Sequence, residues 1–396
     1  MRRIRSVLLV SVIATSLMIP WGGQAAGAKV DISPYQIAPE AQRRLTNLWV
    51  EQLQSKYPPG TWAPMRAELT DEMLDLMGLP PREVLSNMKF PTPTIVDRSG
   101  RTARVSVKEL ARQGFAKQAR SGGNGKGGRG GGTPTDFGPN LVTVAGAGWF
   151  GIRPGSMLLL MSGGGIGLCS MAHVYGSAGA YDISTAGHCG KTGEVGTVIA
   201  AFGNNSSIAG PVLLDFGTFA QSQDGGLGRD WALIDIYSRY QHLVTPTMAF
   251  WGGPRGMYRK TGALVTVTVI QGNRIAPGVS VTPDPFLAQT IVHYGHGAGI
   301  GTGGTPRAGE AIHWGSTHYM FFGAISPGDS GSGANTLAGD AVGANMQAAG
   351  IMTHLWIDLL LRQGLGIMGG TRATQVSGTL ANGQIVPYPV PLPGAP

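Results

Sequence analysis

Short apolar runs, each bounded by turn-forming residues, are the feature that most constrains the fold of this 396-residue chain. From about Asn140 onward they recur between clusters of Gly, Asn, Pro and Ser, and several are rich in β-branched residues. Such runs are typical of strands joined by tight turns, which the 64 glycines of the chain can form. We therefore predict an all-β domain over residues 140–375, with strands near residues 157–161, 195–201, 231–236, 264–270, 320–324 and 349–355.

The end of this domain departs from the strand pattern. Residues 355–364 include three consecutive leucines, and we expect a C-terminal helix there. Residues 376–396 are rich in proline and form a tail that we expect to be extended.

A small, separate and mainly helical region is expected at residues 29–120. Apolar residues recur at helical spacing within residues 40–57, Thr70 is placed to cap a helix that runs to Met77, and Ser106 is placed to cap another that runs to residue 119. The glycine-rich stretch at residues 121–139 reads as a flexible linker. The region before the linker is either a propeptide, so that the chain is a zymogen, or a permanent accessory domain.

The first 28 residues have the pattern of an export signal. Three arginines precede an apolar run over residues 7–21, and Ala26-Gly27-Ala28 matches the small-residue cleavage pattern. An uncleaved membrane anchor is the alternative, but the run is short of the roughly 20 apolar residues that a span needs. We expect a secreted, extracellular protein that has no membrane contact once the signal is cleaved.

The net charge of +8 does not indicate a nucleic-acid partner. The basic excess lies before Pro134, and from there to the end acidic and basic residues nearly balance. Nucleic-acid binding needs clustered Lys and Arg on the folded domain. We expect no nucleic-acid partner.

The strongest chemical signal is the turn at residues 327–333, Pro-Gly-Asp-Ser-Gly-Ser-Gly. A serine nucleophile needs an exposed hydroxyl on a tight turn whose backbone N–H groups can face an oxyanion, and flanking glycines allow that backbone shape. Ser330 is therefore the candidate nucleophile. A solvent-exposed loop is the alternative in a chain so rich in glycine.

Two further segments supply a base and an acid. His188 lies in Thr-Ala-Gly-His-Cys-Gly beside Cys189, one of the two cysteines, and histidine is the usual base for a serine nucleophile. Asp230 stands at the entry of an apolar strand, where a buried carboxylate can hold the histidine tautomer. Asp235 is the rival acid, although its place within the strand is more typical of a solvated face.

The order His188, Asp230, Ser330 resembles the chymotrypsin family of serine proteases. The Thr-Ala-Gly-His-Cys segment is particularly similar to the bacterial streptogrisin and α-lytic protease branch. The resemblance covers residues 151–364, about half of the chain. It implies a double β-barrel and a monomeric serine endopeptidase that acts on a polypeptide substrate without a cofactor. The chain departs from the family where Ser-Gly follows Asp-Ser-Gly.

The resemblance also implies structural partners. Exported chains usually pair their cysteines, and the family bridge corresponds to a Cys169–Cys189 disulfide; two free buried thiols are the alternative. Arg259, in Met-Tyr-Arg-Lys-Thr-Gly, would pair with Asp329. The oxyanion donors would be the backbone N–H groups of Gly328 and Ser330.

The substrate pocket is implied by position in the same way. The residue six before the nucleophile is Ala324, and with Ile325 and Ser326 it offers no charge. Cleavage after apolar residues, rather than after Lys or Arg, is therefore expected. Thr353 corresponds to a hydroxyl beside the buried Asp, on a strand that pairs with the substrate, and Leu355 narrows the pocket.

Two other functions remain open on the sequence. Besides a protease, the chain could be a catalytically inactive binding module of the same fold or a serine esterase. Val-His-Tyr-Gly-His at residues 292–296 is a weak metal signal, because two histidines three residues apart lack a third ligand at a recognised spacing. We predict no metal site.

Overall fold

The computed structural model describes most of the chain after residue 150 and parts of the chain before it. The chain divides into two compact units, Met1–Val30 and Asp31–Pro396, and every described residue belongs to the second. The described residues are 44–45, 47–48, 51–52, 55–57, 62–77, 79–87, 94–96, 102–104, 151–162, 165–200, 212–249, 251–261, 265–271, 274–281, 284–295, 305–325, 328–352 and 364–384.

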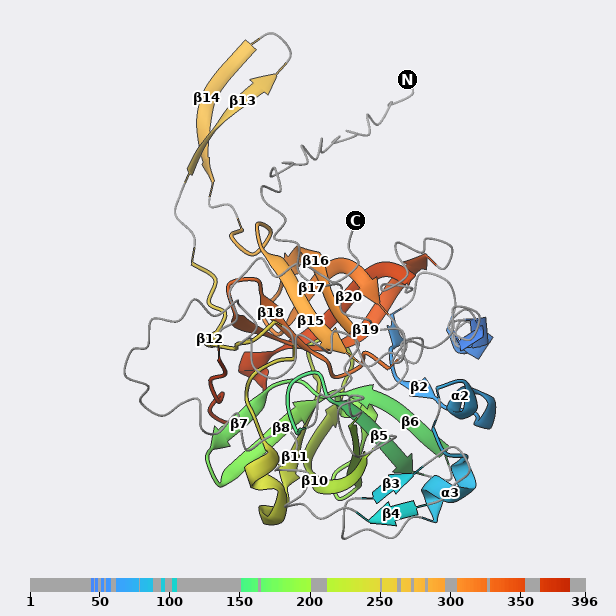
Figure 1. Ribbon diagram of the computed structural model, residues 1–396. Helices are drawn as coiled ribbons and strands as arrows, with labels where there is room; N and C mark the ends of the chain where they lie inside the picture. The colour runs from blue at the N-terminus through green and yellow to red at the C-terminus, as the bar shows by residue number, and fades with distance from the viewer. Residues whose placement is uncertain are drawn as a thin grey trace, which may run out of the picture. The chain divides into compact units, whose positions relative to one another are not determined.

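The first sheet has ten strands, and neighbouring strands pair antiparallel (Figure 1). Its main path runs β2 (Ala67–Glu68), β6 (Gly165–Ser170), β5 (Met157–Ser162), β9 (Val195–Ala200), β10 (Val212–Asp224), β11 (Asp230–Ile236), β8 (Ala180–Thr185) and β7 (Val174–Ser177). β3 (Thr94–Val96) pairs with β10, and β4 (Thr102–Arg104) pairs with β3.

The second sheet has eight strands, and six of them form a closed ring because β19 pairs with both β18 and β20. The ring consists of β19 (Asp340–Met352), β18 (Gly333–Thr336), β15 (Thr290–Gly295), β16 (Thr305–Trp314), β17 (His318–Ile325) and β20 (Gly364–Arg372). β1 (Ala63–Pro64) and β12 (Gly256–Met257) add to β19 from outside the ring. β13 (Val265–Gln271) and β14 (Arg274–Val281) pair with each other.

The expected all-β class and double-barrel architecture are confirmed. Each strand predicted from the sequence corresponds to an observed one, although β19 begins at Asp340 rather than near residue 349. Of the helix expected at residues 355–364, residues 355–363 lie outside the described residues, and Gly364 is the first residue of β20.

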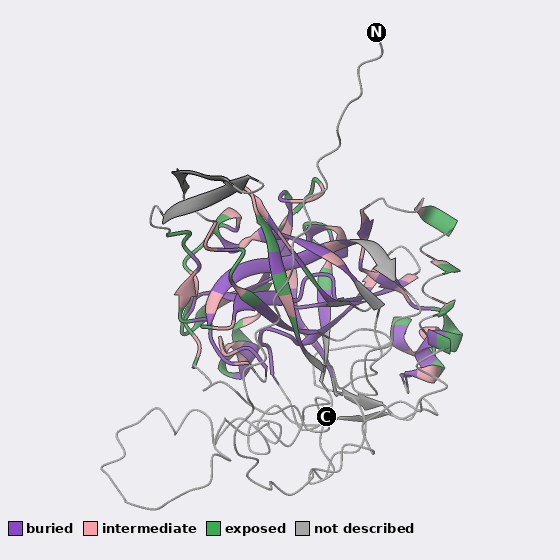
Figure 2. Ribbon diagram, turned by 90° about the horizontal axis from the view of Figure 1, so that it is seen from above, coloured by how far each residue is buried: buried purple, intermediate pink, exposed green. Residues whose placement is uncertain are grey.

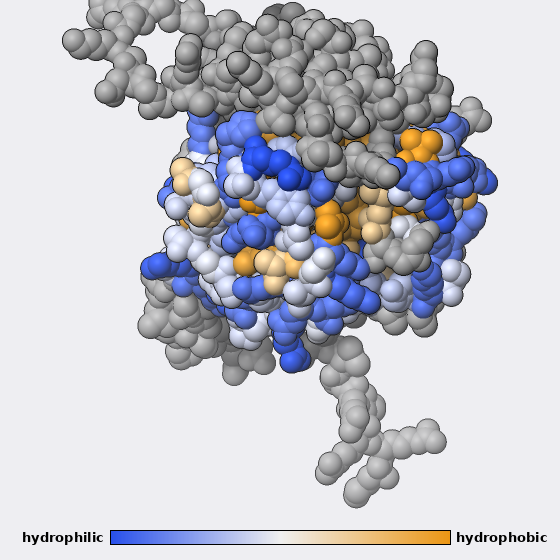
Figure 3. Space-filling view, turned by 90° about the horizontal axis from the view of Figure 1, so that it is seen from below, coloured by the Kyte–Doolittle hydropathy of each residue, from blue (hydrophilic) through white to orange (hydrophobic). Residues whose placement is uncertain are grey.

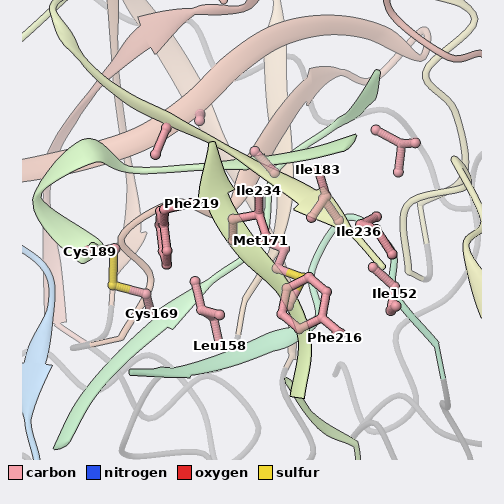
Figure 4. Packing of buried hydrophobic residues seen from close by; sticks show 14 of the residues in the cluster. Ile152, Leu158, Cys169, Met171, Ile183, Cys189, Phe216, Phe219, Ile234 and Ile236 are labelled. Carbon is pink, nitrogen blue, oxygen red and sulfur yellow. A yellow bond between two sulfur atoms is a disulfide. The ribbon is translucent and has the colours of Figure 1, made fainter. Parts of the chain in front are cut away.

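Alternating burial along β11 shows how the sequence places this strand. Asp230, Ala232 and Ile234 are buried, and the rival acid Asp235 is exposed. The apolar residues of β11 join a core with the disulfide at its edge, where Phe216 and Phe219 meet Leu158, Met171 and Ile183 (Figure 4). Met346 of β19 belongs to the same cluster, so the two sheets pack together through this core.

The region before the linker is not structurally separate, because its strands extend both sheets. Ala63 and Pro64 pair with β19, and Ala67 and Glu68 pair with β6. Helix α2 (Asp71–Leu76) begins at Thr70, whose side chain accepts a hydrogen bond from the N–H of Met73 as expected, and α3 (Arg82–Ser86) follows. The described residues at 44–56 within the first predicted helix are helical, and the helix expected from Ser106 lies outside the described residues.

Helices α2 and α3 pack on the first sheet as well as on each other. Leu69, Met73, Leu74 and Leu85 share one buried cluster with residues of β5, β6 and β10. Their removal would expose the outer apolar face of these strands to water.

The described surface is mainly polar. Buried residues predominate along the strands in the view from above (Figure 2), and the hydrophobic spots on the opposite face are small and separated by hydrophilic side chains (Figure 3). Large apolar side chains that stand exposed include Val195, Leu287, Ile312 and Phe322. Within the described residues, no helix combines the length and apolarity required to cross a bilayer.

His173 links the two sheets and should make the fold sensitive to acid. The residue is fully buried just before β7, and its Nε2 lies 2.8 Å from Asn335 Oδ1 in β18. Burial lowers the pKa of His173 to about 4. Since an unfolded chain binds this proton below roughly pH 6.5, the free energy of unfolding falls as the pH drops from there towards 4.

We expect His173→Gln to reduce the loss of stability between pH 7.5 and pH 4.5 by about 2–3 kcal/mol. Urea unfolding at the two pH values measures the difference. His242→Gln is the matched control, because His242 is exposed. An equal loss of stability in wild type and His173→Gln would show that His173 does not cause the acid sensitivity.

Candidate active site

The Ser330 turn connects β17 to β18 and lies against the first sheet. Gly328 and Gly331 have φ angles of 95° and 83°, a region that side-chain-bearing residues rarely adopt. A Cβ on Gly331 would overlap Thr185 Oγ1 and the Ser170 carbonyl oxygen. The N–H of Ser170 donates to the Ser330 carbonyl oxygen at 2.7 Å. Glycine at these positions therefore allows the close contact that holds Ser330.

His188 lies in a short 3₁₀ turn, η4 (Gly187–Cys189), which follows β8. The predicted Cys169–Cys189 disulfide is confirmed, with an S–S distance of 1.98 Å, and it ties this turn to β6. The Ser222 hydroxyl group donates to the Gly190 carbonyl oxygen at 2.6 Å, and its Oγ lies 3.0 Å from the Gly187 carbonyl oxygen. The backbone on both sides of His188 is thus fixed to neighbouring strands.

Asp230 is fully buried at the start of β11 and accepts two hydrogen bonds from His188. The backbone N–H of His188 donates to Oδ1 at 3.0 Å, and Nδ1 lies 2.7 Å from Oδ2. Thr371 Oγ1 accepts from the Asp230 N–H at 3.2 Å and donates to the Asp230 carbonyl oxygen at 2.8 Å. These bonds fix both the backbone and the carboxylate of Asp230.

The three predicted catalytic residues form one hydrogen-bonded line. His188 Nε2 lies 2.6 Å from Ser330 Oγ, opposite the nitrogen that faces Asp230. Because a carboxylate only accepts, Nδ1 carries a proton and Nε2 is left to accept one from the serine hydroxyl. Ser330 Oγ also lies 3.1 Å from the Met346 carbonyl oxygen. The arrangement can remove a proton from Ser330 and return it to a leaving group.

Asp329 pairs with Arg307, not with Arg259. The Arg307 guanidinium donates to Asp329 Oδ2, and both side chains have no exposed surface. Arg259 is exposed. The prediction of an Arg259–Asp329 pair is therefore wrong. Arg307 lies in β16, whose neighbour β15 pairs with β18 and so brings the guanidinium under the Ser330 turn.

The N–H of Gly328, a predicted oxyanion donor, already has an acceptor in this structure. It donates to the carbonyl oxygen of Met65 at 2.6 Å. Met65 belongs to the region before the linker, so a peptide carbonyl of the chain itself lies at the expected oxyanion position. The role of the Ser330 N–H as the second donor stays a prediction.

The predicted substrate pocket is described only in part. Ala324 and Ile325 lie in β17. Ser326, Thr353 and Leu355 lie outside the described residues.

Three residues near the triad were missed by sequence reasoning. Met346 of β19 presents its carbonyl oxygen to Ser330, Thr371 of β20 binds the Asp230 backbone, and Arg307 pairs with Asp329. Their roles depend on strand register, and none lies in a motif that the sequence marks.

A metal ion at this site would compete with the hydrogen-bonded line. Within the described residues, ligand atoms of His188, Asp224 and Asp230 lie within 4.8 Å of one another, and so do those of His188 and the two cysteines. The cysteine sulfurs are bonded to each other, and each nitrogen of the His188 ring faces Asp230 or Ser330. The donor set therefore suits proton transfer better than metal binding.

Comparisons with known proteins yield distant structural likenesses. Neither a protein-family model nor a curated protein matches the sequence. Protease A of Thermobifida fusca is 18% identical, with a TM-score of 0.32 over 57% of this chain and 92% of its own. A Nocardiopsis protease is 19% identical, with a TM-score of 0.29 over 57% of this chain and 94% of its own. A glutamic-acid-specific serine protease is 17% identical, with a TM-score of 0.29 over 57% of this chain and 95% of its own. At such low scores, the case for an activity rests on the geometry of this chain's own residues.

Proposed function

We propose that this chain is a serine endopeptidase that cleaves peptide bonds through an acyl-enzyme on Ser330. The observation that carries the proposal is the line of hydrogen bonds from Asp230 through His188 to Ser330, with distances of 2.7 and 2.6 Å. The rigid supports on either side of His188 favour catalysis over a chance contact, because a catalytic base needs a fixed orientation.

The proposed reaction follows from these contacts. His188 takes the proton of Ser330 while Oγ attacks the substrate carbonyl carbon, and it then gives the proton to the leaving amine. Asp230 orients the imidazole and stabilises its protonated form. The Gly328 N–H binds the oxyanion, a contact that contributes about 3 kcal/mol in comparable sites. Water then repeats the sequence on the acyl-enzyme.

Peptides are the favoured substrate class over small esters. β19 offers backbone hydrogen bonds beside Ser330, as its pairing with Ala63 and Pro64 illustrates. An extended polypeptide can use them and a small ester cannot. With Ala324 and Ile325 at the expected pocket, we propose apolar side chains before the scissile bond.

Export is part of the same proposal. The N-terminal signal pattern and the Cys169–Cys189 disulfide both fit a protein that works outside the cytoplasm. An inactive binding module of the same fold is the competing function.

Labelling with a fluorophosphonate probe tests the activity. The full chain should acquire one phosphonyl group on Ser330 during a long incubation, since the irreversible reaction accumulates each time the site opens. Intact mass and peptide mapping measure the label. Ser332→Ala is the control for the neighbouring hydroxyl and should keep the label, whereas Ser330→Ala should lose it. A folded, disulfide-bonded chain that takes up no label would favour the inactive binding module.

A further inference from the structure

An extended segment of the chain's own N-terminal region lies across the candidate active site. We call residues 62–69 the cleft segment. Burial alternates along it, with Ala63, Met65, Ala67 and Leu69 buried and the residues between them partly exposed. This period of two is that of a strand with one face against the protein.

Backbone hydrogen bonds hold the cleft segment on both sides of Met65. Before Met65, Ala63 is opposite Ala348 in β19, and the Met65 N–H donates to the Met346 carbonyl oxygen at 3.3 Å. After it, Ala67 is opposite Leu168 in β6, and the Leu69 N–H donates to the Ile166 carbonyl oxygen at 2.8 Å. The cleft segment is therefore hydrogen-bonded to β19 of the second sheet before Met65 and to β6 of the first sheet after it. The triad lies between these two contacts.

The Met65 carbonyl group is bound by the N–H group that is expected to bind a scissile carbonyl. Its oxygen accepts from the Gly328 N–H at 2.6 Å. The Met346 carbonyl oxygen that accepts from the Met65 N–H is also 3.1 Å from Ser330 Oγ. The Gly328 N–H belongs to the turn that carries Ser330, and the Met346 carbonyl oxygen contacts Ser330 Oγ. Because both groups also bind the Met65 residue, they hold its carbonyl group close to Ser330.

The side chains around this carbonyl are also held. Met65 has no exposed surface and joins an apolar cluster that includes Ala348 and Met368. Arg66 Nη1 donates to the carbonyl oxygens of His188 and Cys189 at 3.1 and 3.0 Å. A long, unbranched apolar side chain fills the pocket on one side of the peptide bond, and an arginine is anchored beside the base on the other.

We infer that the Met65–Arg66 peptide bond is a substrate of Ser330 within the same molecule, an inference that rests on the proposed function. Ser330 Oγ bonds to the Met65 carbonyl carbon while His188 takes the hydroxyl proton. The C–N bond to Arg66 breaks, and His188 gives the proton to the Arg66 nitrogen. Water then hydrolyses the Met65 ester and frees Ser330. The same geometry assigns methionine-like side chains as the preferred residues before the scissile bond.

Both products of this cleavage keep an anchor on the protein. The chain from Arg66 onward stays because Leu69, Met73 and Leu74 are buried against the first sheet, and the chain that ends at Met65 carries Leu45, which belongs to the same cluster. Hydrolysis of the ester frees the new carboxyl end at Met65 to leave the pocket, while Leu45 keeps the rest of that product attached. Because the new amine of Arg66 stays beside the acyl-enzyme, re-formation of the bond competes with hydrolysis and makes self-cleavage slow.

The His188 side chain is 7% exposed while the segment is bound. A hollow lined by Pro64, Arg66, Glu68, His188 and Asp224 opens beside the imidazole, and the lining side chain of Glu68 is 44% exposed. The cleft segment therefore excludes other polypeptides from the site without sealing His188 from solvent. Until Met65 is released, the segment acts as an inhibitor of cleavage in trans.

The first experiment follows the full chain over time by intact mass and N-terminal sequencing. A new N-terminus at Arg66 should form with a first-order rate constant that stays the same over an about hundredfold range of protein concentration, as expected for an intramolecular reaction. Ser330→Ala should remain uncut. A rate constant that rises with concentration, or an uncut chain that nonetheless cleaves added peptides, would overturn the inference.

The second experiment opens the site in the full chain. Met65→Asp places a carboxylate in the apolar pocket, which disfavours docking of the segment, and should speed fluorophosphonate labelling of Ser330 by about tenfold or more. Arg66→Ala keeps the pocket residue and removes the two bonds to the η4 turn, so it should speed labelling by a smaller factor. It serves as the second variant if Met65→Asp does not fold. Arg44→Ala, which removes an exposed arginine paired with Glu72, is the matched control and should label like wild type.

The outcomes separate this inference from the proposed function. If Met65→Asp and Arg66→Ala label no faster than wild type while wild type hydrolyses peptides, the proposed function is supported and the inference of an internal substrate is overturned. If no folded variant labels or hydrolyses any peptide, the proposed function fails and the inference fails with it.

Discussion

Replacing His188 by alanine should lower kcat for a peptide substrate by about a million-fold, and Ser330→Ala should lower it by a similar factor. His188 Nε2 is 2.6 Å from Ser330 Oγ, and no other titratable side chain has a hydrogen bond to that oxygen among the described residues. The hydroxyl therefore depends on one base for its activation.

The double variant His188→Ala/Ser330→Ala should be no slower than either single variant. Residues that act as a unit lose their whole effect when one member is removed. Asp230→Asn should cost less, about ten-thousand-fold, because the amide still fills the buried site but turns the imidazole to the wrong tautomer. Steady-state kinetics on an internally quenched peptide measure all four values.

Asp235→Asn is the matched control for Asp230→Asn. Both acids lie on β11, but Asp235 is exposed and Asp230 is fully buried against His188. The control should keep kcat within about a factor of two, as is usual for surface substitutions. Loss of activity in Asp235→Asn rather than in Asp230→Asn would contradict the assignment of the acid.

The triad residues could be predicted from the sequence because the backbone setting of each one is built locally. Glycines around Ser330, a cysteine beside His188 and an apolar strand after Asp230 each prescribe a backbone shape within a few residues. The strands could also be predicted, because a strand buried on one face has alternating apolar residues and a strand buried on both faces has a short continuous apolar run.

The partners of the triad could not be predicted in the same way because they depend on long-range register. Arg307 reaches Asp329 only through the pairing of β16 with β15 and of β15 with β18. Arg259 lies in the segment whose sequence resembles the one that supplies this arginine in the family, but its side chain is exposed. The position of Met65 depends on two strand pairings that join it to residues more than 100 positions away, for which no local pattern exists.

Replacing Arg307 by methionine should lower the free energy of unfolding by about 3–5 kcal/mol, the usual effect of removing one partner of a buried ion pair. The Arg307 and Asp329 side chains have no exposed surface. A Cβ on Gly295 would overlap Asp329 Oδ1, so protein atoms rather than solvent surround the carboxylate. Methionine fills much of the volume of arginine but leaves the buried charge without its guanidinium.

Arg259→Met is the matched control, because it makes the same substitution at an exposed arginine and should change stability by less than about 0.5 kcal/mol. Adding Asp329→Asn to Arg307→Met removes the negative charge that the guanidinium balances in the wild type, so the double variant should be more stable than the sum of the single effects by about 1–3 kcal/mol. Urea unfolding of the four proteins gives these values. Strong destabilisation by Arg259→Met with little effect of Arg307→Met would restore the pairing expected from the sequence.

The Arg307→Met variant should also lose peptide hydrolysis at urea concentrations below those that unfold it. Asp329 precedes Ser330, so this ion pair holds the turn that orients the nucleophile.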